Sequence, residues 1–285
     1  MAPAERTPEA QAICERFSRE YALARAPAMR EIERAVFGCD YGGTSWTTRQ
    51  EADEVARRLD LKPGLHLLEV GAGSGWPGLY FASTTGCGVT LTDLPFEAMR
   101  IAADRIAVDG LARSCWVLAS DAAAMPFGDG VFDAISHSDV LCCLEAKSSV
   151  LAECRRAIRR GGTMAFSVIS IASDLSPRDR ARAAAAGPPF KAASSDYPAL
   201  LTAAGWRMEG CVDLTVQYAR AIRRTIAEEQ ARASALGELL GSSAFAERME
   251  RRARTIQAVD AGLLRRELFV AVAADRPAAD PKHDR

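Results

Sequence analysis

The sequence has little of what marks membrane, nucleic-acid-binding or metal-binding proteins. Nowhere in its 285 residues does an apolar stretch approach the roughly 20 residues that a membrane-spanning helix needs. Its 36 Lys and Arg face 37 Asp and Glu, and the formal charge of −1 gives no support to a basic nucleic-acid surface. Three histidines leave little for a His-based metal site. We therefore expect no membrane partner, no nucleic acid and no bound metal.

The eight cysteines include no C-x-x-C pair, and we expect most of them to be buried free thiols. Charged residues such as Glu5, Arg6 and Glu9 interrupt the first 20 positions and leave no apolar core for a signal peptide. Both observations predict a cytoplasmic protein. A hydrophobic fraction of 48% and a charged fraction of 26% are ordinary for a globular chain, here one large domain or one domain with a cap.

The central part of the chain alternates between apolar runs of strand length and helical segments. Strands are expected at 65–70, 89–93, 115–119, 132–136 and 163–169, and two later ones at 206–214 and 267–273. Helices are expected at 79–84, 95–108, 150–160 and 197–204. Gly161-Gly162 would stop the helix at 150–160. This alternation is typical of an α/β fold with a mostly parallel sheet and helices on both faces.

Further helical stretches lie outside this alternation. Residues 9–37 read as helical with an interruption near Pro27, residues 173–194 are mixed, and residues 216–262 read as one or two long helices. Thr48 with Glu51 three positions later predicts a capping box at the start of another helix. We expect the extra helices to cover a pocket for a small molecule. The alternative is a packing or dimerisation element, which would make the protein a homodimer.

The most informative stretch is Glu69-Val70-Gly71-Ala72-Gly73-Ser74-Gly75, which follows a strand and precedes a helix. Glycines at this position allow a tight turn and let a ligand approach the main chain. A dinucleotide-binding G-x-G-x-x-G loop would need glycine where Trp76 stands. The neighbouring carboxylate of Glu69 would repel a phosphate, so the loop suits a cationic ligand better.

Two more acids follow the next two strands. Asp93 ends the second strand and can accept hydrogen bonds from both hydroxyls of a ribose. Asp121 follows the third strand and can accept from an adenine amine. Together with the glycine loop they describe a nucleoside lying across the carboxyl edge of the sheet, where open α/β sheets bind ligands.

These motifs in series resemble the class I S-adenosylmethionine-dependent methyltransferases. The matching pieces are LHLLEVGAGSG (65–75), VTLTD (89–93), SDAAAMPF (120–127) and FDAISHSDVL (132–141). The resemblance implies a Rossmann-like sheet of seven strands in the order 3-2-1-4-5-7-6, with the last strand antiparallel. It also implies S-adenosylmethionine as the cofactor and transfer of its methyl group to a small molecule.

The resemblance implies roles for individual residues. Gly71, Ala72, Gly73 and Gly75 would lie along the methionine moiety, and Glu69 would orient its amino group. Asp93 would hold the ribose, Leu94 would pack on adenine, and Asp121 with the Ala122 amide would read the adenine edge. The loop 40–46 is similar to the segment before the core in sterol and ubiquinone methyltransferases, where a Tyr or Trp closes over the cofactor. Tyr41 and Trp46 are the candidates, and the alternative is that they are aromatic anchors that pack the N-terminal helices.

The resemblance also divides the chain. Residues 1–48 would be an N-terminal helical cap segment, and residues 49–275 the methyltransferase domain with helical insertions at about 173–194 and 216–262. Residues 276–285, a polar stretch with two prolines, would be a disordered tail.

The candidate catalytic residues follow the fourth strand, in Ser136–Cys143. This stretch lacks the N/D-P-P-Y/F run of enzymes that methylate nucleic-acid amines. It resembles an S-x-D-x-x-x-H pattern of some phosphobase and quinone methyltransferases, with Cys143 in the place of the His. Asp139 would therefore face the sulfonium or a cationic acceptor. His137 is a candidate general base, and the alternative is that it packs beside the adenosine or caps a helix.

Two other functions remain open on the sequence. Cys142 and Cys143 could bind a soft acceptor such as arsenite, with Cys39 or Cys154 as a third ligand, or they could be ordinary core residues. The same fold could also serve as a non-catalytic module that binds S-adenosylmethionine. The cofactor-binding motifs are shared by both, so they do not separate an enzyme from such a module.

Overall fold

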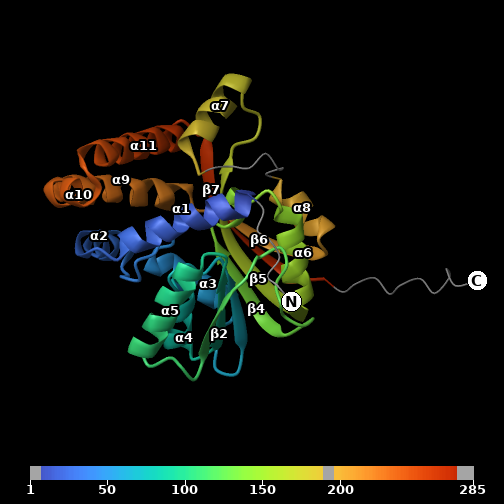
Figure 1. Cartoon of the computed structure of the whole chain (residues 1–285). Coiled ribbons are helices and arrows are strands. Elements are labelled where there is room, and N and C mark those ends of the chain that lie inside the picture. The colour runs from blue at the N-terminus through green and yellow to red at the C-terminus, as the bar shows by residue number, and fades with distance from the viewer. Residues whose placement is uncertain (1–7, 189–195, 275–285) are drawn as a thin grey trace, which may run out of the picture.

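The computed structural model describes residues 8–188 and 196–274 (Figure 1). The predicted tail at 276–285, the first seven residues and part of the insertion at 173–194 lie outside the described residues. No helix within the described part is long and apolar enough to cross a membrane.

The described residues form a seven-stranded sheet in the order β3-β2-β1-β4-β5-β7-β6, which confirms the predicted topology. Strand β7 runs antiparallel to both of its neighbours, and the other pairings are parallel. The strands are β1 (His66–Val70), β2 (Gly88–Asp93), β3 (Cys115–Ala119), β4 (Phe132–Ser138), β5 (Ile158–Ile171), β6 (Trp206–Asp213) and β7 (Leu264–Ala273).

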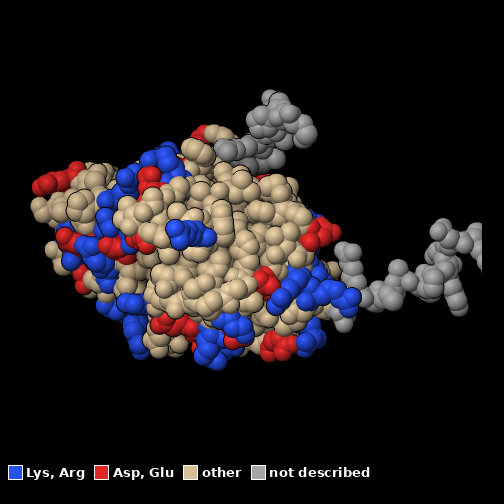
Figure 2. Space-filling model, turned by 90° about the horizontal axis from the view of Figure 1, so that it is seen from below, with Lys and Arg blue, Asp and Glu red and all other residues tan. Residues whose placement is uncertain are grey.

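Helices cover both faces of this sheet because successive residues of each buried strand point to opposite sides. Leu67 of β1 packs into the core under α3 (Arg49–Arg58), α4 (Gly78–Thr85) and α5 (Phe96–Val108). Its neighbour Leu68 packs into the core under α6 (Lys147–Ala157) and α8 (Tyr197–Ala203). On the face drawn in Figure 2, acidic and basic side chains are interspersed.

A third group of helices lies beyond the carboxyl ends of the parallel strands (Figure 1). It consists of α1 (Pro8–Ala24), α2 (Pro27–Phe37), α7 (Pro177–Ala186), α9 (Thr215–Ala231), α10 (Ala233–Leu240) and α11 (Ser242–Asp260). Ile32 and Val36 of α2 share a small core with Ala221 of α9 and Leu236 of α10. The two ends of the sequence therefore meet in one helical layer.

Local signals set most helix boundaries. At the start of α3, the Thr48 hydroxyl accepts from the Glu51 amide at 3.2 Å, and the Glu51 carboxylate accepts from the Thr48 amide at 2.9 Å. This reciprocal pair confirms the predicted capping box. The stretch expected as one or two helices at 216–262 forms three, since Gly241 breaks the second from the third with a φ of +83°.

One predicted boundary is wrong. The helix expected to continue to residue 160 ends at Ala157, and β5 begins at Ile158. Ile158 is 2% exposed and pairs with Phe132 of β4, so burial and sheet pairing override the helix propensity of the segment. Gly161 and Gly162 instead lie inside the strand, next to an irregularity in its pairing with β4.

A buried arginine joins the segment before α3 to the sheet. Arg266 of β7 is 1% exposed, and its Nη1 donates to both carboxylate oxygens of Glu51 at 3.1 Å. Its Nε donates to both oxygens of Asp139, also at 3.1 Å, and its Nη2 donates to the hydroxyls of Thr47 and Ser167 at 3.2 Å. Burial disfavours the charged guanidinium, but the two carboxylates raise the pKa of Arg266 above its ordinary value.

We predict that Arg266→Met lowers the free energy of unfolding by about 3–5 kcal/mol, because two buried carboxylates lose their counter-charge. Arg266→Lys should cost less, since it keeps the charge and loses the fork of donors. Urea unfolding measures both. The matched control is Arg265→Met on the neighbouring, exposed position, which should change stability by less than about 0.5 kcal/mol. An unchanged urea midpoint for Arg266→Met would contradict the role of this cluster.

Candidate functional site

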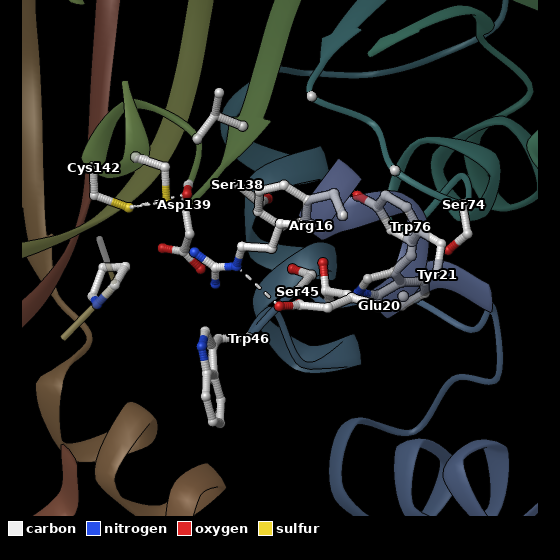
Figure 3. A pocket seen from close by; sticks show the side chains of 18 of the residues that line it. Arg16, Glu20, Tyr21, Ser45, Trp46, Ser74, Trp76, Ser138, Asp139 and Cys142 are labelled. Atoms are coloured by element: carbon white, nitrogen blue, oxygen red, sulfur yellow. Dashed lines mark hydrogen bonds and ion pairs between the residues drawn. The ribbon is translucent and has the colours of Figure 1, made fainter. Parts of the chain in front are cut away.

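A cavity of about 560 Å³ lies between the carboxyl ends of the strands and the outer helical layer. Its walls come from the glycine loop after β1, the ends of β2, β3 and β4, and helices α1, α2, α9 and α11. Figure 3 shows Asp139 and Cys142 on one side and Tyr21, Ser74 and Trp76 on the other. The volume lies in the range of about 300–1,000 Å³ that is usual for small-molecule sites.

The glycine loop needs its glycines for backbone conformation. Gly71, Gly73 and Gly75 have φ values of +65°, +54° and +104°, which side chains rarely allow. A Cβ at Gly73 would lie 2.7 Å from the Tyr21 hydroxyl, and one at Gly71 would overlap Val140. Gly71, Ala72 and Gly73 line the cavity, whereas Gly75 lies behind the wall and serves the turn into α4.

Asp93 lines the cavity where β2 ends. Its carboxylate accepts from the amides of Gly73 at 2.8 Å and Leu94 at 2.7 Å, which ties the glycine loop to the end of the neighbouring strand. Burial raises the pKa of Asp93 to about 6, although hydrogen bonds from these amides and from Tyr21 act in the opposite direction. Leu94 is also in the wall, as predicted for a residue that packs on a ligand.

Asp121 and Ala122 line the same wall after β3. The Asp121 side chain is exposed and accepts from the Ala123 amide at 2.8 Å, which is a local turn interaction. Thus three successive strand ends place a glycine loop and two aspartates around one part of the cavity. This is the arrangement that the sequence predicted for the cofactor end.

Glu69 lies beneath the glycine loop rather than in the cavity wall. It is 1% exposed and accepts a hydrogen bond from the Ser136 hydroxyl. Burial raises the pKa of Glu69 to about 7, opposed by that hydrogen bond. The Glu69 carboxylate thus pairs with Ser136 and does not itself line the cavity.

The two aromatic candidates of the loop 40–46 lie in different places. Tyr41 packs on Trp76 with ring centres 5.3 Å apart and under the Arg105 guanidinium at 4.4 Å, outside the cavity wall. Trp46 lines the cavity. The centre of its ring is 5.1 Å from the ring centre of Tyr218 of α9 and 5.0 Å from Cζ of the Arg252 guanidinium of α11. These contacts belong to the end of the cavity that faces the outer helices.

Asp139 stands in the cavity wall directly after β4. Its φ of +56° is unusual for a residue with a side chain, and Asp tolerates it better than most. The Ser167 hydroxyl donates to its carboxylate at 3.1 Å, beside the bonds from Arg266 described above. The surrounding contacts thus hold the carboxylate at the junction of the two ends of the cavity.

His137 lies outside the wall of this cavity. Its ring is 1% exposed and stacks on Phe166 with centres 4.6 Å apart, and neither ring nitrogen has a hydrogen-bond partner among the described residues. Burial lowers the pKa of His137 to about 3. These features favour the packing alternative over a general base.

Cys142 and Cys143 line the cavity with their sulfur atoms 3.8 Å apart. The thiol of Cys142 contacts the Asp139 carbonyl at 3.0 Å. Cys39 and Cys154 are buried in other parts of the chain, each outside the wall. Within residues 8–188 and 196–274, no three His, Cys, Asp or Glu side chains are grouped as metal ligands, so the arsenite alternative lacks its third ligand there.

The structure adds residues that sequence reasoning missed. Tyr21 of α1 is 5% exposed and covers Gly73, and no sequence signal distinguishes it from other aromatic residues of the N-terminal helices. Ser74 is 1% exposed, lines the cavity, and its hydroxyl has no hydrogen-bond partner among the described residues. Its place inside the glycine loop could have suggested it. Glu229, Arg248 and Arg252 complete the opposite end.

Known proteins resemble this chain in sequence and in fold. Residues 68–166 match a protein family described as a methyltransferase domain. Methyltransferase GfsG of Streptomyces halstedii is 29% identical over 58% of this chain and 61% of its own length. The ubiquinone/menaquinone biosynthesis C-methyltransferase UbiE of Bordetella avium is 32% identical over 42% of this chain and 47% of its own. This chain therefore spans less than two thirds of either relative.

The fold has similar solved structures over nearly its whole length. The geranyl diphosphate C-methyltransferase of Streptomyces coelicolor A3(2), solved with Mg²⁺, geranyl diphosphate and S-adenosyl-L-homocysteine, has a TM-score of 0.73. It covers 95% of this chain and 100% of its own, at 15% identity. At that identity the likeness concerns the fold.

We predict that His137 stays neutral from pH 8 to pH 5, because burial without a partner penalises the charged ring. Proton-detected NMR of the imidazole should show no titration of His137 in that range. His66, which is partly buried and also has a lowered pKa, is the internal comparison because it contacts Thr90 and lies nearer the surface. A midpoint near 6.5 for His137 would contradict this prediction and restore it as a candidate base.

Proposed function

We propose that this chain is a class I S-adenosylmethionine-dependent methyltransferase and that it transfers a methyl group from S-adenosylmethionine to a small molecule inside the cavity. The observation that carries the proposal is the convergence of the glycine loop, Asp93 and Asp121 on one end of a cavity whose other end is lined by helices. Asp139 stands between the two ends.

The residues at the glycine-loop end fit S-adenosylmethionine. The backbone of Gly71–Gly73 gives close access to the main chain, and the unpartnered Ser74 hydroxyl offers a hydrogen bond to a polar ligand group. The Asp93 carboxylate can accept from ribose hydroxyls, and Leu94 with Ala122 supplies a surface for the base. When bound, S-adenosylmethionine supplies a methyl group on a positively charged sulfur.

Methyl transfer needs the reacting groups to be aligned and water to be excluded. Helices α1, α2, α9 and α11 line much of the cavity and would keep water from part of it, which suits a small acceptor rather than a macromolecule. We propose that the N-terminal segment up to residue 48 and the helices at 215–260 form the cap over the acceptor. Residues 49–274 would form the methyltransferase domain into which the later helices are inserted.

Asp139 is the proposed catalytic residue. Its carboxylate can interact with positive charge on the cofactor or acceptor, or accept a proton that leaves the acceptor. Arg266, Ser167 and the left-handed backbone of Asp139 itself hold the carboxylate in one position. Preorganisation of this kind lets a charged group act without reorganising during the reaction.

We predict that binding of S-adenosylhomocysteine weakens as the pH falls from 7.5 to 5.5. Because its pKa is raised to about 6, Asp93 of the ligand-free protein takes up a proton in this range. The protonated carboxyl group then no longer accepts hydrogen bonds from both ribose hydroxyls. The dissociation constant, measured by calorimetry, should rise about fourfold by pH 5.5. Asp93→Asn should weaken binding at pH 7.5 by about tenfold or more. It should also remove the pH dependence of the dissociation constant between pH 7.5 and 5.5.

The matched control for this experiment is Asp104→Asn, on the exposed side of α5 and outside the cavity wall. It should leave both the affinity and its pH dependence unchanged. Equal affinity at pH 7.5 and 5.5 in the unaltered protein, together with normal binding by Asp93→Asn, would remove the basis for the cofactor site.

We predict that Asp139→Asn lowers turnover at least about tenfold and changes cofactor affinity less than about threefold. Asn tolerates the left-handed backbone, so the variant mainly removes charge. The measurement is release of S-adenosylhomocysteine from S-adenosylmethionine with a library of small metabolites. Asp129→Asn, in an exposed turn, is the control. Full turnover by Asp139→Asn would refute its role, and cofactor binding without turnover on any acceptor would favour a non-catalytic module.

A further inference from the structure

The end of the cavity remote from the glycine loop contains a fully buried carboxylate. Glu229 of α9 is 0% exposed, and its Oε1 accepts from Arg248 at 2.7 Å and from Nη2 of Arg252 at 3.4 Å. Both arginines belong to α11, and all three side chains line the cavity. This ion-pair cluster therefore borders the space proposed for the acceptor.

Two atoms of this cluster have no hydrogen-bond partner among the described residues. They are Oε2 of Glu229, which can only accept, and Nε of Arg252, which can only donate. Both atoms are buried. Because Nη2 of Arg252 already contacts Oε1 of Glu229, the two unpartnered atoms belong to adjoining groups. A buried polar atom without a partner is costly, so a ligand group that satisfies both would be favoured.

We propose that Glu229 and Arg252 anchor an uncharged, hydroxyl-bearing acceptor, an assignment that rests on the proposed methyltransferase function. A hydroxyl group both donates and accepts, so one such group can donate to Glu229 and accept from Arg252. A carboxylate or phosphate would meet the negative charge of Glu229. An ammonium group would meet the positive charges of Arg248 and Arg252.

The surrounding wall suits an apolar or aromatic body for this acceptor. The Trp46 ring lies under the Arg252 guanidinium and is edge-on to Tyr218, which leaves an aromatic surface beside the anchor. Met29 and Ile32 of α2 and Leu240 at the end of α10 add apolar surface to the lining. The substrate class is thus an uncharged apolar or aromatic compound with at least one hydroxyl group.

Three matched probes test this assignment on the full chain. Biphenyl-4-methanol, biphenyl-4-carboxylate and biphenyl-4-methylammonium share a frame and differ in their polar group. Their dissociation constants are measured by NMR titration with saturating S-adenosylhomocysteine and again without it. We expect the alcohol to bind at least about tenfold more tightly than either charged probe. Tightest binding by the carboxylate or the ammonium, or binding by none of the three, would overturn the proposal.

Two variants should change the preference in opposite directions. Glu229→Gln removes the negative charge, so the carboxylate probe should gain about tenfold relative to the alcohol. Arg252→Met removes one positive charge and should favour the ammonium probe instead. Glu228→Gln is the control, since Glu228 lies on the same helix and pairs with Arg232 outside the cavity. It should leave the order of the probes unchanged.

The readouts separate this proposal from the methyltransferase assignment. Thermal unfolding of each variant shows whether it is folded. If Glu229→Gln does not fold, the proposal is tested by Arg252→Met alone, which should shift the preference toward the ammonium probe. An unchanged order of probes in every folded cavity variant, or an equal change in Glu228→Gln, would refute the anchor. Failure to bind S-adenosylhomocysteine would count against the proposed function alone, because the preference among probes is also measured without it.

Discussion

The arrangement of this protein depends on one buried charge cluster, in which Arg266 bridges Glu51 and Asp139. The three side chains come from positions that are far apart in sequence: the first turn of α3, the loop after β4, and the antiparallel strand β7. A buried guanidinium is costly unless its donors are satisfied, and here all three nitrogens donate to carboxylate or hydroxyl oxygens. Because Asp139 also lines the cavity, the cluster that fastens the N-terminal segment to the sheet holds the proposed catalytic carboxylate as well. Stability and positioning therefore share one interaction.

The cavity has two ends of different origin. The glycine-loop end is built by the carboxyl edges of parallel strands, where backbone groups and the aspartates of successive strands face a ligand. The opposite end is built by helices from both ends of the chain, with Trp46 between α9 and α11. The first end, which we propose as the cofactor site, has glycines and aspartates, and the second differs in kind, with arginines and a buried glutamate. A division of this type allows one cofactor site to be combined with many acceptors.

Local sequence signals predicted the fold well where local physics decides it. Three features were predicted: the Thr48–Glu51 capping box, the glycine loop, and the positions of six strands within a few residues. All of them depend on hydrogen bonds, backbone conformation and hydrophobic periodicity among residues that are close in sequence. The strand order came from the resemblance to a family, since nothing in periodicity specifies which strands pair. The end of α6 was mispredicted because Ile158 is drawn into the sheet by β4, a partner 26 residues earlier in the chain. His137 and Trp46 show the same limit: their types suggested roles, and their burial and neighbours decided where they lie.

The sequence by itself determined the glycine-loop end of the cavity, which we propose as the cofactor site, because a strand, a glycine turn and a following acid are contiguous and their geometry is set by the backbone. Only the tertiary structure decided the other end. Glu229 and Arg252 have the types of ordinary charges on solvated helices. Their burial depends on α11 packing against α9, where Arg252 pairs with Glu229 and lies over Trp46. Long-range packing removed these charges from water, and that desolvation leaves buried polar atoms at the place that we propose as the acceptor anchor.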